Sequence, residues 1–115
     1  MRFVNLTPHK IVLRPQEGED IVVEPSGTIA RVAMAPGARL SEVLGIPVYG
    51  RDERGGVEGL PAADGESVFI VSGMAGASAE CRMRNDILVP GTGPEDGVIR
   101  NEKGWVIAVT RLKRP

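Results

Sequence analysis

The sequence SVFIVSGMAGASAECRMR, residues 67–84, joins the most apolar strand candidate of the chain to its one helix candidate. Four consecutive apolar residues, Val68 to Val71, predict a buried strand. The alanines, methionines and glutamate that follow favour a helix, and Ser72 stands where an N-cap belongs. Met74, Ala77 and Cys81 would share one helix face, whose small side chains would let the helix lie close to a sheet.

A further apolar run, Ile87 to Pro90, follows this helix candidate directly. Residues 67–90 therefore read as strand, helix and strand in a short length of chain. That length is tight for a parallel crossover, so an antiparallel return of the second strand stays open.

Short apolar runs separated by turn residues fill the rest of the chain and predict a sheet that is mostly antiparallel. We expect one domain over residues 1–115, of the α+β class, with meanders or hairpins and one short helix. Residues 35–45 are expected to form a loop and residues 111–115 a frayed tail. The expected strands and hairpins are a strand at 3–6, a meander of 11–14, 21–24 and 28–34, and hairpins of 46–49 with 56–60 and 98–100 with 105–110.

Composition excludes several classes of function. The chain has 14 Lys and Arg against 15 Asp and Glu, a net charge of -1, so no overall field draws it to nucleic acid or to an acidic membrane. No apolar run reaches the length of a membrane helix, and the N-terminus lacks the apolar region of a signal peptide. Cys81 is the only cysteine, so no internal disulfide forms. We therefore expect a cytoplasmic protein.

The residues available for catalysis are few. His9 is the only histidine, so with Cys81 the chain lacks the four ligands of a structural zinc site, and no metal is expected. Ser72 lacks the glycine two residues before it that a nucleophile elbow requires. No glycine-rich dinucleotide or phosphate loop is present, so we expect no cofactor. The balance favours a protein without catalytic activity.

Two groups of polar residues could bind a ligand. The turn into the predicted helix, at Ser72 and Gly73, would expose backbone N–H groups to an anion, although Ser72 would equally serve as a cap for its own helix. Arg31 or Arg84 would supply the positive charge beside that anion. A second group lies beside predicted strand ends and would form either a small-molecule site or a set of turn-stabilising side chains; its members are Asn5, Thr7, His9, Ser26 and Arg31.

Several motifs, taken in order, resemble a family of small bacterial and bacteriophage proteins. The family opens with Asn-Leu-Thr-Pro-His, as this chain does at 5–9, and typically has Tyr-Ile-Val-Ser where Phe69 begins the matching run here. The resemblance implies a bacterial or bacteriophage origin and no particular mechanism. The other matching segments are 26–32 (Ser-Gly-x-x-Ala-Arg-Val), 59–61 (Gly-Leu-Pro), 84–91 (Arg to Pro-Gly) and 100–107 (Arg-x-x-x-Gly-x-x-Ile).

The leading functional hypothesis is a non-catalytic protein that binds or sequesters a small anion, a phosphate-containing or nucleotide-like molecule. One alternative is a small hydrolase-type enzyme with His9 as general base and Asp86 as the group that orients it. Another is a protein-interaction module that uses edge strands and the charged segment 51–54. A site shared between subunits of a homo-oligomer is compatible with each of them.

Overall fold

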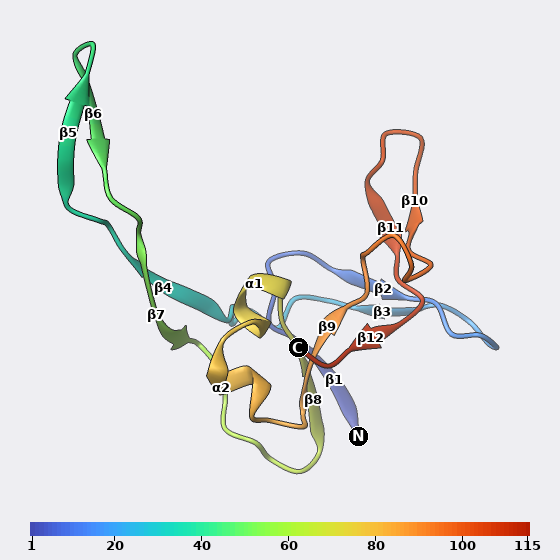
Figure 1. Cartoon of the computed structure of the whole chain (residues 1–115). Helices are drawn as coiled ribbons and strands as arrows, with labels where there is room; N and C mark the ends of the chain where they lie inside the picture. Colours follow the sequence, from blue (N-terminus) through green and yellow to red (C-terminus); the bar gives the residue numbers. More distant parts are fainter.

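The computed structural model describes all residues from 1 to 115, and a four-stranded sheet forms its centre (Figure 1). The strand order is β1 (Arg2–Asn5), β8 (Ser67–Ile70), β9 (Ile87–Pro90) and β12 (Leu112–Lys113). β1 and β9 both run parallel to β8, and β12 runs antiparallel to β9. The central sheet is therefore mainly parallel, whereas most other strand pairs of this β-rich chain are antiparallel, as expected.

The connection from β8 to β9 is a parallel crossover, which settles the alternative left open above. It contains two one-turn helices, α1 (Gly73–Gly76) and α2 (Ala79–Arg82), instead of the single helix expected. The break follows from a second cap: the Ser78 hydroxyl accepts a hydrogen bond from the Cys81 N–H, and Ser78 itself has extended backbone. Neither helix is long and apolar enough to span a membrane.

Two of the expected hairpins are present. β2 pairs with β3, and β10 pairs with β11, both antiparallel. Gly104 has a φ of 82° in the turn of the second hairpin, a conformation that glycine adopts without strain. The tail expected at the C-terminus is instead strand β12, because its backbone pairs with β9. The bounds are β2 Ile11–Leu13, β3 Ile21–Val23, β10 Ile99–Arg100 and β11 Val106–Ala108.

Residues 31–58 form a long two-stranded ribbon, which we call the ribbon arm (Figure 1). Its inner half is β4 (Arg31–Ala35) paired with β7 (Glu53–Glu58), and its outer half is β5 (Arg39–Val43) paired with β6 (Ile46–Tyr49). Three expectations are wrong here: β4 does not join the β2–β3 meander, residues 35–45 are not a loop, and β6 does not pair with residues 56–60. The reason is the turn at residues 44–45, which pairs β5 with β6 and leaves β4 and β7 to each other.

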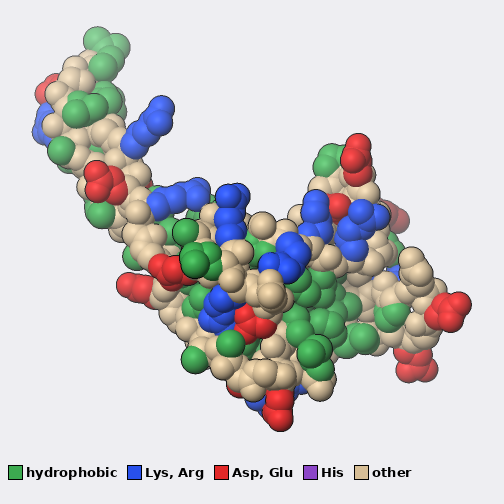
Figure 2. Space-filling view, turned by 60° about the horizontal axis from the view of Figure 1, so that its bottom comes forward, with side chains coloured by type: hydrophobic (Ala, Val, Ile, Leu, Met, Phe, Trp, Pro, Cys, Tyr) green, Lys and Arg blue, Asp and Glu red, His purple; other side chains and the backbone are tan.

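The ribbon arm makes the molecule far from spherical, as the space-filling view also shows (Figure 2). The extents are 58 × 39 × 25 Å and the radius of gyration is 17.3 Å, against about 13 Å for a compact domain of this length. The accessible surface is 8051 Å², about 2,000 Å² more than a compact monomer of this mass exposes. Only 17 of the 115 residues are buried, so much of the chain depends on few core contacts.

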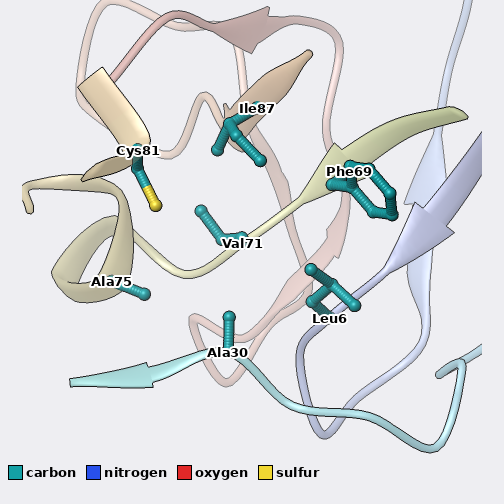
Figure 3. Close-up of a cluster of buried hydrophobic side chains, with 7 residues drawn as sticks. All are labelled: Leu6, Ala30, Phe69, Val71, Ala75, Cys81 and Ile87. Carbon is teal, nitrogen blue, oxygen red and sulfur yellow. The ribbon is translucent and has the colours of Figure 1, made fainter. Parts of the chain in front are cut away.

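The larger core cluster lies between the central sheet and the crossover helices (Figure 3). Val71 lies near Ala75 of α1 and Cys81 of α2, whereas Phe69 lies at the other side of the cluster, near Leu6. Gly76 lets α1 approach the sheet, because a Cβ there would lie 2.5 Å from the Val89 side chain. The complete cluster is Leu6, Ala30, Phe69, Val71, Ala75, Cys81 and Ile87.

A second cluster lies on the other face of β8. Ile70 points away from Phe69 and Val71, as alternate residues of a strand do, and packs with Leu13, Val23 and Val109. β8 is thus buried on both faces, which is why its sequence is continuously apolar instead of alternating.

Acid is expected to destabilise the fold through Asp64, which lies in the turn before β8. The Glu66 N–H, the Ser67 hydroxyl and the Ser67 N–H donate to its carboxylate and lower its pKa from 3.8 to about 2. Because the pKa is lower in the folded state, this stabilisation is complete above the unfolded pKa near 4 and is lost as the pH falls toward 2. Urea unfolding at stepped pH should show a shallower acid decline for Asp64→Asn, and an unchanged slope would contradict this role.

Candidate functional site

Asn5 is the centre of the predicted polar group, and its side chain is fully buried. Its Nδ2 donates to the His9 carbonyl at 2.7 Å and to the Val23 carbonyl at 3.1 Å. Its Oδ1 accepts from the backbone N–H of Thr7 at 2.9 Å and the Thr7 hydroxyl at 2.7 Å. Four hydrogen bonds use the whole amide, so Asn5 joins the end of β1 to the approach to β2 and the end of β3. Asn5 is therefore a structural residue, and it presents no free group to a ligand.

The other members of that group separate in space. The Ser26 hydroxyl bonds only to the backbone of Thr28, in its own turn. The His9 side chain faces a groove beside β2, whereas Arg31 borders a different hollow, at the root of the ribbon arm. The five residues do not form one site.

Three predicted residues do meet around one hollow. Thr7, Arg31 and Ser72 border a cavity of about 340 Å³, together with apolar side chains of β4 and α1. The Ser72 hydroxyl accepts a hydrogen bond from the Ala75 N–H at 3.2 Å. Ser72 therefore caps α1, which was the alternative to an anion site. Gly73 has open space around the position of a Cβ, so nothing there requires glycine for close approach. The Arg31 guanidinium forms no hydrogen bond or ion pair within the chain.

Arg84 and Asp86 bind each other instead of a ligand or His9. Two parallel hydrogen bonds of 2.9 and 2.7 Å join the guanidinium to the carboxylate, and Arg84 also donates to the Pro61 carbonyl. The Arg84 hydrogen bonds hold the pKa of Asp86 below its usual range. The hydrolase pair of His9 and Asp86 is not formed, because no hydrogen bond joins the two residues. No group of three or more His, Cys, Asp or Glu side chains is placed to hold a metal ion.

A second hollow is a groove between β2 and β11, which we call the β2–β11 groove. It has a volume of about 540 Å³ and is lined mainly by apolar side chains of residues 11–12 and 106–109, with His9 and Lys10 at one side. A single parallel bridge, between Leu13 of β2 and Val109 just after β11, joins the two segments. Both residues of this bridge belong to the second core cluster.

The free end of the ribbon arm carries an unusual number of exposed apolar side chains (Figure 2). The register places Val43 opposite Ile46 and Ser41 opposite Val48, so these four residues share one face of the outer ribbon. Every residue of β5 and β6 is exposed. The exposed hydrophobic residues of the outer ribbon are Leu40, Val43, Leu44, Ile46, Val48 and Tyr49.

Leu44 occupies the most unfavourable position in the arm. It is 98% exposed and is the only non-glycine residue with positive φ, at 51°, followed by Gly45 at 84°. Two-residue hairpin turns with positive φ at both positions favour Asn, Asp or Gly first, and a bulky residue there is an outlier. Sequence reasoning missed this turn, although Leu-Gly between two apolar runs was a signal for it.

The inner half of the ribbon arm, β4 and β7, fixes the position of the outer half relative to the central sheet and its core. Val32 of β4 and Val57 of β7 pack against the larger core cluster. The Glu80 carboxylate of α2 accepts a hydrogen bond of 3.2 Å from the Val57 N–H. The arm therefore leaves the body in a direction set by the core.

Comparisons with protein-family models, with curated proteins and with solved structures find no match for this chain. The family resemblance described above stays a prediction.

Proposed function

We propose that the protein is a protein-interaction module that docks through the outer half of the ribbon arm. The observation that carries this proposal is Leu44, a fully exposed leucine in a strained turn at the end of an apolar ribbon. Strained backbone persists where the surroundings or the function require it. An exposed hydrophobic patch on a single chain is typical of a surface that a partner covers.

The shape of the arm supports the same function. An unprotected apolar ribbon exposes edges that favour unwanted pairing, and natural proteins normally shield such edges with charges, proline or bulges. The outer ribbon has the ion pair of Arg39 with Glu42, a proline at position 47 and a register irregularity between residues 39 and 41, yet the apolar side chains on its face stay exposed. Because the inner ribbon is anchored in the core, a partner would meet a preorganised surface and less conformational entropy would be lost on binding.

Site-specific photo-crosslinking tests this function. A benzophenone amino acid at position 41, on the apolar face, should yield a defined protein adduct in cells of the source organism. The same group at Glu17, an exposed residue of the β2–β3 loop, is the control and should not. Adding Leu44→Asn should remove the adduct at position 41. An adduct that survives this change, or one that position 17 shares, would contradict docking through the arm.

A small anion in the hollow beside Arg31 is a second candidate function. Its support is that the unpaired Arg31 guanidinium borders an open hollow together with Thr7 and Ser72. Arginine suits bidentate recognition of phosphate or carboxylate. Three of the other residues predicted for ligand binding, Asn5, Ser26 and Arg84, use their polar atoms within the chain, and His9 and Gly73 do not border this hollow.

Calorimetric titration with inorganic phosphate and with nucleotides tests this second function. Arg31→Gln should weaken binding by about tenfold or more, the usual contribution of a charge-assisted hydrogen bond. Arg51→Gln, a change of the same kind on the arm but outside the hollow, should leave the affinity unchanged. Absence of binding at millimolar ligand, or equal losses in both variants, would rule the site out.

A further inference from the structure

The chain has two apolar surfaces that cannot meet within one molecule, the tip of the ribbon arm and the β2–β11 groove. The ribbon arm leaves the body on the side away from the β10–β11 hairpin, whereas the β2–β11 groove lies beside that hairpin (Figures 1 and 2). The anchoring of the inner ribbon in the core fixes this separation.

We propose that the tip of the ribbon arm, residues 43–46, inserts into the β2–β11 groove of a second copy of this chain. This inference rests on the proposed function and names the partner. The groove, about 540 Å³ and mainly apolar, offers space for several side chains of the size of Leu44, Val43 and Ile46. The two surfaces match in chemistry, since the tip exposes Val43, Leu44 and Ile46 and the groove is lined mainly by the apolar residues 11–12 and 106–109.

The charges at the two surfaces are compatible with this contact. Lys10 lies at the side of the groove and has no ion-pair partner in its own chain. Glu42 stands next to the apolar tip, more than half exposed, with a single partner, Arg39, at 3.3 Å. Insertion of the tip would bring a carboxylate to the side of the groove where the unpaired ammonium lies.

The exposed area agrees with a dimer. A stable interface buries about 800 Å² on each partner. The tip contributes Leu44, which is 98% exposed, with Ile46 at 66% and Val43 at 57%, so it offers a largely uncovered apolar surface to such an interface. Since each copy carries one tip and one groove, a two-fold axis would fill both grooves and close the assembly.

Complementation between two defective variants tests the proposal. Leu44→Asn removes the apolar side chain that would enter the groove. Ile107→Asp places a charge in the groove at a half-exposed position. Sedimentation at micromolar concentration should show the unaltered protein as a dimer. Each variant alone should be a monomer, with self-association weakened about thirtyfold or more. Mixing the two should give a heterodimer held by one of the two contacts, because the intact tip of one variant fits the intact groove of the other.

Matched changes elsewhere serve as controls. Met83→Asn and Met83→Asp alter an exposed apolar residue outside the tip and the groove and should leave the dimer intact. If Ile107→Asp does not fold, as judged by circular dichroism, Val106→Asp carries the same charge into the groove.

Three results would overturn the inference. They are an unaltered protein that is monomeric, a groove variant that still dimerises, and a mixture that does not associate. The crosslink at position 41 distinguishes failure of the dimer proposal from failure of the proposed function. An adduct with the mass of two chains supports a second copy. An adduct of another mass that is lost in Leu44→Asn would support docking through the arm and would show that the partner is not a second copy.

Discussion

Asn5→Ala is expected to lower the free energy of unfolding by about 3 kcal/mol. The change removes four hydrogen bonds and takes the Asn5 donor away from the carbonyls of His9 and Val23, of which the His9 carbonyl keeps the Thr7 hydroxyl as a donor. A buried polar group left unpaired costs about 1–3 kcal/mol. The Val23 carbonyl lies in a buried region, whereas His9 is exposed enough for water to replace its lost partner. Chemical denaturation measures the difference.

Two further variants identify the cause of that loss. Asn5→Asp keeps the acceptor for Thr7 but replaces the donor with an oxygen facing two carbonyls, so it should destabilise the fold at neutral pH as well. Ser26→Ala, which removes only bonds within an exposed turn, should change stability by less than about 0.5 kcal/mol. An Asn5→Ala variant as stable as the unaltered protein would contradict the structural role of Asn5.

Leu44→Asn is expected to raise the stability of the isolated chain while it abolishes association. A left-handed conformation costs a bulky residue about 1–2 kcal/mol, and asparagine tolerates it better. The variant should therefore unfold with a free energy that is higher by up to about 1 kcal/mol. Thermal melting and sedimentation of the same samples measure both effects.

Leu44→Ala separates the two consequences of that substitution. Alanine removes the apolar side chain but retains the positive φ, so association should be lost without the gain in stability. If Leu44→Asn associates as the unaltered protein does, the exposed leucine has no role in docking, whatever its effect on stability.

The segments that could be predicted from the sequence are those in which local signals agree with the final packing. The apolar run before Ser72 identified β8, because a strand buried on both faces needs apolar residues on both. The β2–β3 and β10–β11 hairpins followed from β-branched runs around short polar turns. Ser72 was correctly placed as a cap, but a second cap at Ser78 divides the helix.

The ribbon arm could not be predicted in this way. Its pairing depends on the turn at Leu44, a residue that disfavours the conformation it adopts, so the local signal was weak. Its outer strands are exposed on both faces and therefore lack the alternation that a half-buried strand shows. The same two properties point to the arm as a functional element, since sequence rules fail most often where function opposes local stability.

The sequence correctly indicated that polar residues near the N-terminus interact, but it did not show that their role is structural. Asn5 and Thr7 do interact, through the buried amide at the end of β1. Arg31 and His9 border separate hollows, because β4 pairs with β7 in the arm instead of with β3. That one pairing could not be deduced from strand propensities, and it decides where Arg31 lies.

Thiol protection is the most direct test of docking through the ribbon arm. Cys81 is fully buried, so an introduced Ser41→Cys would be the only accessible thiol of the folded chain. Its labelling by maleimide should be at least tenfold slower in intact cells of the source organism than in dilute purified protein. Glu17→Cys should label at the same rate relative to free thiol in both conditions, and Leu44→Asn should restore rapid labelling at position 41. Equal rates at position 41 in cells and in dilute solution would contradict the account.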